Sequence, residues 1–394
     1  MIMSRKIFLL VLCILLVVGC TLIAGCSELL TGAGPATKYA SSSQTSPTQT
    51  QTVVPMQTVT TLNTLASGTL VPGPSPAAEI MAPQPVDLSS YHPLRVILQS
   101  GDKLEYRTIK FRFRGVDYTL KIPVNMSIYR AASTSANKQM IMDDKDSGLI
   151  YGQIVADPAM DPFYNDAIKE VRNLRYKGGK MLSDDEYLEM VVSFVQQIPY
   201  DNTTPGVRYP IEVIYDQKGD SDEKSILLAG LLSREGYDAG LLIFPSMKSV
   251  VPGIGIHLTT NNPSFKVFSD GNRDFMYIEP TTTRLIGFYP DDYKTAPKPI
   301  VVPVGNGKLT YGQVDDVMNI FTDLNSIKRN ALALAEKIED AQANNMTVLQ
   351  WDFDTYVSYL KTIEDVESTN DRVKAMEWIK ESELPHNSAC VSCD

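Results

Sequence analysis

Apolar side chains recur at regular spacings after residue 86, and those spacings predict most of the regular structure. Two β-rich stretches, Thr108 to Phe113 and Val116 to Ile122, flank Arg114-Gly115, which predicts a β-hairpin. Arg95 to Leu98 has the composition of a further strand. Asp161 to Leu174 has helical spacing. This part of the chain is therefore expected to combine strands with at least one helix.

Two helices in the middle of the chain have well-marked starts. Ser183 precedes Glu186 by three residues, which is the pattern of a capping box, and apolar side chains then follow at helical spacing as far as Pro199. The next helix is predicted to begin at Asp220-Ser221 and to end before Gly236, a residue type favoured just after a helix. Each helix is expected to bury one apolar face.

Short β-rich stretches follow these helices, and helical spacing returns after Pro303. The predicted strands are Leu241 to Phe244, Ile254 to Thr259, Phe265 to Ser269 and Phe275 to Ile278. The later helices are predicted at Val314 to Ala341 and Phe353 to Trp378, as a long α-hairpin or small helical domain. The expected fold class is α+β with a helical C-terminal region.

The N-terminal segment has the pattern of an export signal. Basic Arg5 and Lys6 precede an apolar run that ends in Leu22-Ile23-Ala24-Gly25-Cys26. This run resembles a lipoprotein lipobox, in which cleavage leaves a lipidated cysteine, here Cys26. Cys20 also fits the pattern, and an uncleaved anchor is the alternative, because about 20 apolar residues span a bilayer. All of these interpretations predict an exported protein tethered to the outer face of the cytoplasmic membrane.

Composition then divides the chain into five expected parts. Residues 27–85 are rich in Ser, Thr, Gln and Pro, which predicts a disordered stalk. The parts are 1–26 (signal peptide or anchor), 27–85 (stalk), 86–180 (β-rich N-terminal part), 181–305 (core) and 306–394 (helical region with a cysteine-containing tail).

Charge and cysteine usage exclude some functions. The chain has 36 Lys+Arg and 46 Asp+Glu, a net charge of −10, which argues against nucleic-acid binding. No cysteine lies between Cys26 and Cys390, so the body has no cysteine nucleophile. His386, Cys390 and Cys393 offer three zinc-type ligands without a fourth nearby, so a disulfide or an unstructured tail is preferred. We expect no metal and no other cofactor.

Several motifs occur in a fixed order between Leu182 and Tyr289, just over a quarter of the chain. They are Tyr209-Pro210-Ile211-Glu212, Gly219-Asp220-Ser221-Asp222-Glu223, Gly236-Tyr237-Asp238-Ala239, His257 and Tyr277-Ile278-Glu279-Pro280-Thr281. Together they resemble the transglutaminase-like superfamily, whose papain-like core serves transglutaminases, peptidases and peptide N-glycanases. The resemblance implies a helix with the nucleophile position at its start, packed on an antiparallel sheet.

The resemblance assigns the catalytic positions to Ser221, His257 and Glu279. In the family, a cysteine at the helix N-terminus is activated by the helix dipole and a histidine, and an acid orients that histidine. Here Ser221 replaces the cysteine, and Glu279 replaces the usual aspartate. A thiol titrates at about 8.5, whereas a serine hydroxyl stays protonated and depends on an aligned base. Activity is therefore expected to be absent or greatly reduced.

Each of these residues also has a structural alternative. Ser221 with Asp220 can simply cap a helix, His257 can be a buried strand residue, and Glu279 can end a strand. Gln196 or Gln197 can resemble an oxyanion donor, although a place on the helix surface is preferred. Three Asn-x-Ser/Thr triplets, at Asn125, Asn202 and Asn345, match the glycosylation sequon.

Three functions follow from these observations. We expect a catalytically degenerate protein whose cleft binds a peptide or a segment of a cell-envelope protein. The second hypothesis is an enzyme with Ser221 as nucleophile, His257 as base and Glu279 as orienting acid, acting on amide bonds. The third is a structural surface protein that assembles through its helical C-terminal region.

Overall fold

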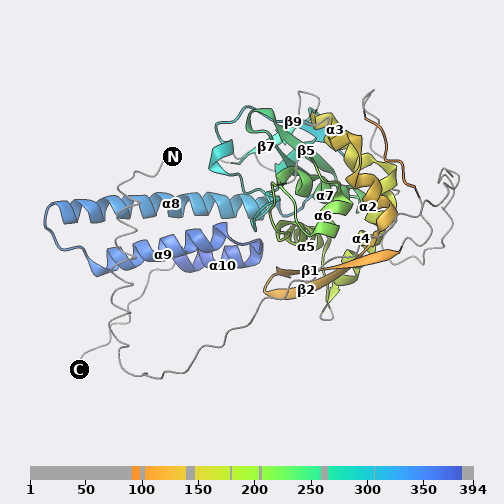
Figure 1. Cartoon of the computed structure of the whole chain (residues 1–394). Coiled ribbons are helices and arrows are strands. Elements are labelled where there is room, and N and C mark those ends of the chain that lie inside the picture. The colour runs from red at the N-terminus through yellow and green to blue at the C-terminus, as the bar shows by residue number, and fades with distance from the viewer. Residues whose placement is uncertain are drawn as a thin grey trace, which may run out of the picture. The chain divides into compact units, whose positions relative to one another are not determined.

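The computed structural model describes residues 91–97, 103–138, 147–177, 180–203, 206–258, 265–305 and 307–383 (Figure 1). The chain divides into two units, Met1–Gly68 and Thr69–Asp394, and every described residue belongs to the second. The predicted lipidation positions Cys26 and Cys20, the 27–85 stalk and the Cys390–Cys393 tail lie outside these ranges. No helix within the described ranges combines the length and the apolar character that a membrane span requires.

An antiparallel five-stranded sheet forms the centre of this unit, with the strand order β7-β8-β6-β5-β9. Its strands are β5 (Ala239–Phe244), β6 (Ser249–Ile256), β7 (Val267–Ser269), β8 (Asp274–Tyr277) and β9 (Ile300–Pro303). Side chains alternate between the two faces of a strand, so Leu241 and Ile243 join the main core, whereas Leu242 and Phe244 join a second, aromatic cluster.

Helices and a long hairpin pack around this sheet (Figure 1). The hairpin pairs β1 (Leu104–Phe113) with β2 (Val116–Asn125). The helices in this part are α2 (Met126–Ser133), α3 (Ser147–Ala156), α4 (Asp161–Leu174), α5 (Asp184–Gln196), α6 (Pro210–Asp216) and α7 (Ser221–Arg234). The short elements are η2 (Pro158–Met160), β3 (Tyr176–Lys177), β4 (Lys180–Met181), η3 (Pro245–Met247) and η4 (Asp291–Tyr293).

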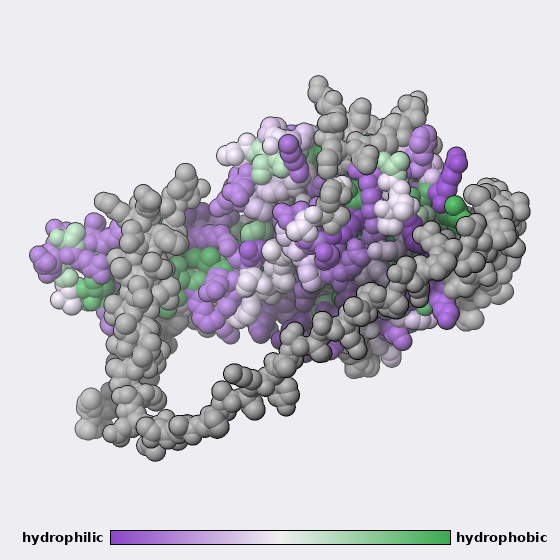
Figure 2. All heavy atoms as spheres, in the orientation of Figure 1, coloured by the Kyte–Doolittle hydropathy of each residue, from purple (hydrophilic) through white to green (hydrophobic). Residues whose placement is uncertain are grey.

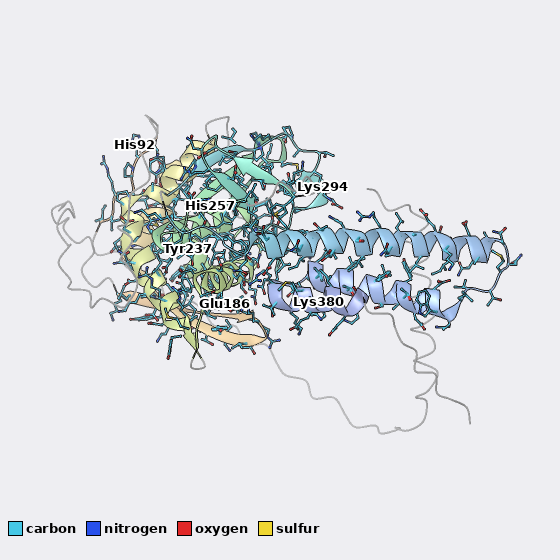
Figure 3. The ribbon with its side chains drawn as sticks, turned by 180° about the vertical axis from the view of Figure 1, so that it is seen from behind. His92, Glu186, Tyr237, His257, Lys294 and Lys380 are labelled. Atoms are coloured by element: carbon cyan, nitrogen blue, oxygen red, sulfur yellow. The ribbon has the colours of Figure 1, made fainter. Side chains whose placement is uncertain are left out.

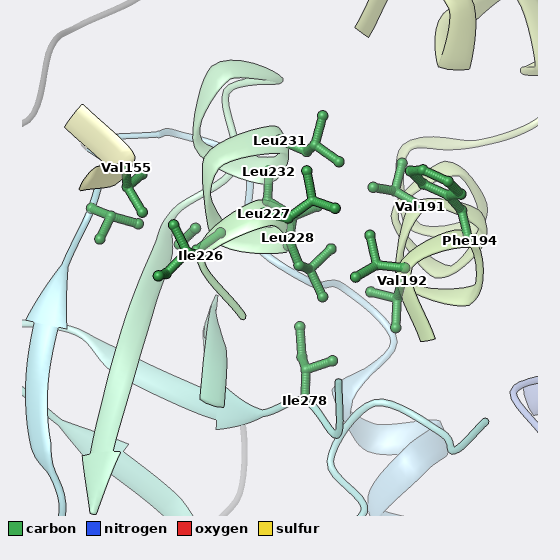
Figure 4. Close-up of a cluster of buried hydrophobic side chains, with 14 of the residues drawn as sticks. Val155, Val191, Val192, Phe194, Ile226, Leu227, Leu228, Leu231, Leu232 and Ile278 are labelled. Carbon is green, nitrogen blue, oxygen red and sulfur yellow. The ribbon is translucent and has the colours of Figure 1, made fainter. Parts of the chain in front are cut away.

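Helix α7 is the central helix of the core. Its side chains from Ile226 to Leu232 are almost completely buried, on more than one face of the helix. Figure 4 shows Leu227, Leu228 and Leu231 between the sheet and the Val191–Phe194 side of α5. Burying a leucine side chain stabilises a fold by roughly 1.5–3 kcal/mol. The start of α7 is therefore held in a fixed position relative to β6.

Three helices make up the C-terminal region: α8 (Val314–Ala343), α9 (Gln350–Glu367) and α10 (Arg372–Glu383). The first turn of α8 packs in the main core through Val314, Val317 and Met318. Farther along, the three helices share their own apolar clusters. The single helix expected from Phe353 to Trp378 is in fact two, because residues 368–371 turn the chain back between α9 and α10.

A buried ionic cluster, which we call the Glu189 hub, joins the hairpin, the core and this helical region. The Glu189 carboxylate on α5 accepts hydrogen bonds from Arg114 Nη2 (2.8 Å), Tyr311 Oη (2.8 Å) and Arg372 Nε (3.1 Å). Arg114 comes from the β1–β2 turn and Arg372 from the start of α10. Nearby, Asn370 donates to Ser193 Oγ at 2.6 Å. Residues far apart in sequence are thus tied together at one carboxylate.

The expected α+β class with an antiparallel sheet and a helical C-terminal region is confirmed. The hairpin at Arg114-Gly115, the Ser183–Glu186 capping box and the Asp220 cap are all present. The strand predicted at Arg95 is wrong, because residues 91–97 have no regular structure. Helices α2, α3 and α6 and strand β9 were not predicted.

Candidate functional site

The first turn of α7 presents Ser221 at the start of a well-capped helix. The Asp220 side chain accepts a hydrogen bond from the Glu223 amide (3.0 Å), and Glu223 Oε2 accepts one from the Asp220 amide (3.0 Å). This reciprocal arrangement uses amide groups that a helix start leaves free. Ser221 is half-buried, and its hydroxyl donates to Asp222 Oδ1 at 3.1 Å. Its hydrogen therefore points at a carboxylate and not at a nitrogen base.

Asp222 ties this turn to α3 and β6. Its carboxylate accepts hydrogen bonds from Tyr151 Oη on α3 (2.8 Å) and from the Val250 amide on β6 (2.8 Å), besides that of Ser221. Ser225 Oγ, one turn further along α7, donates to the Val250 carbonyl at 2.9 Å. Burial outweighs these hydrogen bonds and raises the pKa of Asp222 to about 6.

This raised pKa predicts a pH-dependent stability that depends on Asp222. The folded form holds its proton more tightly than the unfolded chain, so the carboxyl stabilises the fold at low pH and this contribution is lost as pH rises through about 6. Asp222→Asn keeps an acceptor oxygen for the Val250 amide and presents its NH2 group to the Tyr151 hydroxyl, which can accept, but it cannot titrate. Between pH 5 and pH 7.5 the parent should lose about 1 kcal/mol more unfolding free energy than this variant. Urea denaturation at both pH values measures the difference, and parallel pH profiles would contradict the prediction.

His257 does not reach Ser221, which corrects the expected triad. It is exposed and follows the last residue of β6, Ile256. The start of α7 lies beside Val250, seven residues earlier on the same strand, and a strand rises about 3.3 Å per residue. The two side chains are therefore about 20 Å apart along β6. His257 instead lies near Asp238, which follows the other end of α7; burial raises the pKa of Asp238, and Arg273 and His257 oppose this rise (His257 and Tyr237 are labelled in Figure 3).

Glu279 lies at the same end of the sheet as Ser221. It follows β8, whose Tyr277 pairs with Gly253 of β6, and the next amide, Ile278, donates to the Pro252 carbonyl. The Glu279 carboxylate accepts hydrogen bonds from Tyr277 Oη (2.9 Å) and the Thr281 amide (2.9 Å). Two of the three predicted site residues thus share one end of the sheet, while the histidine lies at the other.

A tyrosine-based cluster occupies the space at this end of β6. Tyr293 Oη donates to Ser249 Oγ at 2.8 Å, and Ser249 is the first residue of β6, next to Val250. The Tyr293 pKa is raised first by burial, and the nearby charges of Glu279 and Asp222 add to the effect. Hydroxyl groups and carboxylates, and no imidazole, therefore surround the start of α7 in the part of the chain that the structure describes.

The side chains of Lys224 and Gln196 are buried next to this cluster, and both donate hydrogen bonds to main-chain carbonyls. Lys224 Nζ donates to the carbonyls of Gln196 (3.0 Å) and Ile198 (2.7 Å), and burial lowers its pKa to about 8. Gln196 Nε2 donates to the carbonyls of Glu279 and Arg284, each at 2.9 Å. Gln196 is thus a buried residue that positions the Glu279 turn and not a helix-surface residue. Gln197 donates to the Arg112 carbonyl at 2.7 Å, away from the start of α7.

Metal binding finds no support in the described ranges, where no group of three or more His, Cys, Asp or Glu side chains is arranged to hold an ion. His386, Cys390 and Cys393, for which a disulfide or an unstructured tail is expected, lie outside these ranges.

Comparisons with known proteins add little to this site. No protein-family model matches the chain, and no curated protein matches it. Among solved structures, calcium-bound LapG of Legionella pneumophila is similar over 39% of this chain and 97% of its own, with 14% identity and a TM-score of 0.19. A similarity of this size carries no conclusion about this chain, so the site is interpreted from its own geometry.

Proposed function

We propose that this protein is a catalytically degenerate member of the transglutaminase-like superfamily that is exported, tethered to the outer face of the cytoplasmic membrane, and binds a peptide or envelope-protein segment. The motifs around Asp220-Ser221 and Glu279 support the family, and the N-terminal lipobox pattern supports the tether. Its partners are then a peptide chain and, through Cys26, the membrane.

The observation that carries the proposal is the hydrogen bond from Ser221 Oγ to Asp222 Oδ1 (3.1 Å). A serine nucleophile needs a base within about 3.2 Å that takes its proton in the reaction. The chain has three histidines: His257 is about 20 Å away, no hydrogen bond joins His92 to Ser221 among the described residues, and His386 lies outside the described ranges. Lys224 is committed to backbone carbonyls. The base within reach of Ser221 is therefore the Asp222 carboxylate, and none of the imidazoles or amines that the structure describes bonds to it, so the histidine-dependent triad of the resemblance is incomplete.

Binding without catalysis is consistent with the remaining surface of the site. Ser221, Ser249 and Tyr293 are each half-buried, so solvent still reaches this end of the sheet. Because these three residues remain partly exposed, their hydroxyl groups can exchange hydrogen bonds with the backbone of an extended peptide. The nearby carboxylates Asp222 and Glu279 give the site a negative character that favours a peptide with basic side chains.

The test compares the chain without residues 1–85 with its Ser221→Ala and Ser221→Cys variants. All three are incubated with a fluorescent peptide library, and both hydrolysis and amine incorporation are measured. We expect no turnover by the parent or the alanine variant, and retention of a common set of peptides by both. Turnover by the parent that is lost in Ser221→Ala would instead establish a serine enzyme. Absence of both turnover and peptide retention would favour the structural surface protein.

A further inference from the structure

We propose that Asn345 is an N-glycosylation site and that Asn125, which has the same sequence signature, is not. This inference rests on the export in the proposed function for its biological setting. The sequence alone does not distinguish the triplets Asn125-Met126-Ser127 and Asn345-Met346-Thr347. The structure does distinguish them, because a transferase must bind both the asparagine amide and the hydroxyl two residues later.

Asn125 is already used by the fold. It is the last residue of β2 and the N-cap of α2, and its Oδ1 accepts hydrogen bonds from the amides of Ser127 (2.9 Å) and Ile128 (3.4 Å). Ser127, which supplies the hydroxyl of this triplet, is only 2% exposed. A transferase would have to break this cap in order to bind the Asn125 side chain together with the buried Ser127 hydroxyl. A cap of this kind typically contributes about 1 kcal/mol.

Asn345 has the opposite surroundings. It lies in the connection between α8 and α9, and Asn345, Met346 and Thr347 are all exposed. Its φ of 53° is left-handed, a conformation that asparagine adopts more readily than most residues, and its amide donates to the Gln342 carbonyl. No described residue forms a side-chain hydrogen bond with it. The complete triplet is therefore accessible on a connection that no strand or helix occupies.

The surface around Asn345 gives the modification a physical consequence. Met346, Leu349 and Trp351 are 58%, 60% and 56% exposed, which is unusual for large apolar side chains close together. Apolar side chains stand among hydrophilic ones at this end of the α8–α9 hairpin in Figure 2. A hydrated oligosaccharide on Asn345 would shield these side chains from other molecules. The chemical class of the added group is thus a bulky, polar N-linked glycan.

The proposed step is a group transfer from a lipid-pyrophosphate-linked oligosaccharide. The side-chain amide nitrogen of Asn345 (Nδ2) attacks the anomeric carbon of the first sugar. A C–N bond forms while the C–O bond to the pyrophosphate breaks. The lipid pyrophosphate leaves with the bonding electron pair, and the amide proton passes to a base of the transferase. No oxidant or reductant is needed.

The test uses the folded full-length chain in detergent, an oligosaccharyltransferase that accepts Asn-x-Ser/Thr, and its lipid-linked donor. Peptide mass spectrometry measures occupancy at each asparagine. We expect occupancy at Asn345 at least tenfold above that at Asn125, no modification of Thr347→Ala at Asn345, and retention in the matched Thr347→Ser variant. Chemical unfolding before the reaction should raise occupancy at Asn125, because Ser127 then becomes accessible.

A synthetic peptide covering residues 340–350 provides the reference. If the peptide is modified and the folded chain is not, Asn345 is not accessible to the transferase in the folded protein, and the proposal is overturned. If neither is modified, it is overturned because the triplet is not a substrate. Equal occupancy at Asn125 and Asn345 in the folded chain would overturn the distinction between them. None of these outcomes depends on peptide binding or export, so the proposed function stands or falls separately.

Discussion

Replacing Glu189 with alanine should lower the free energy of unfolding by about 3–5 kcal/mol, because it leaves the buried guanidinium of Arg372 and the half-buried guanidinium of Arg114 without their shared carboxylate. Glu189 is 4% exposed, and its oxygens accept hydrogen bonds from Arg114, Arg372 and Tyr311. Arg114 retains Glu186 (2.6 Å) and Arg372 retains Asp316, but these partners are more exposed. Because the hub joins the hairpin, α5 and α10, we expect the loss to affect the whole described unit.

Urea denaturation followed by circular dichroism measures this loss, and two other variants define its cause. Glu189→Gln keeps the shape and one acceptor oxygen, so it should cost less than the alanine variant. Asp117→Ala removes an ion pair with Arg112 in which the side chains are 65% and 74% exposed, so its effect should stay below about 1 kcal/mol. A Glu189→Ala loss no larger than that of Asp117→Ala would show that the buried cluster does not stabilise the fold.

Local signals allowed the sequence to predict α5 and α7 accurately. Ser183 and Glu186 bond to each other's backbone across the first turn of α5, and Asp220 and Glu223 do the same at α7. Such signals depend on residues three positions apart and need no tertiary information. The Glu189 hub is different, because its partners Arg372 and Tyr311 are 183 and 122 residues away in the sequence. No periodicity contains that information.

The error at His257 has a physical origin in β6. Pro252 and Gly253 weaken the strand pattern, so the strand was predicted to begin only at Ile254 and to include His257. In the structure β6 begins at Ser249 and ends at Ile256. Strand β5 pairs with both Pro252 and Gly253, and β8 pairs with Gly253, so the strand continues through these two residues. The strand residue beside the start of α7 is therefore Val250, preceded by Ser249. The β-branched Val250-Val251 pair was the available signal for that earlier start.

Other missed elements also carried local signals. Asn125 is a strong N-cap residue before α2, and Pro210 occupies the favoured first position of α6. The Tyr209-Pro210-Ile211-Glu212 motif supported the family resemblance and equally indicated a helix start. Helix α3 is apolar on most sides, and such a segment cannot be distinguished from a buried strand by periodicity alone.

Building a thiol and an imidazole into the site should restore a reactive nucleophile, and the position of the histidine should decide the result. The Ser221→Cys thiol alone has carboxylates nearby, so it should react as an ordinary thiol with a pKa of about 8.5 or above. Adding Ser249→His places an imidazole where Tyr293 now bonds to Ser249, within reach of the charges of Asp222 and Glu279. An imidazolium there stabilises the thiolate.

A fall in thiol pKa from about 8.5 to about 7 raises the thiolate fraction at pH 6.5 by roughly 25-fold. Each thiolate is then less nucleophilic, by about fivefold, because nucleophilicity falls with thiol pKa. Alkylation at residue 221 by iodoacetamide, mapped by mass spectrometry so that the native cysteines do not interfere, should therefore accelerate roughly fivefold in the double variant. The matched control is Ser221→Cys combined with His257→Ala, which should react at the rate of Ser221→Cys alone. A slower reaction in that control would place His257 beside residue 221 after all, and would restore the triad that the register of β6 excludes.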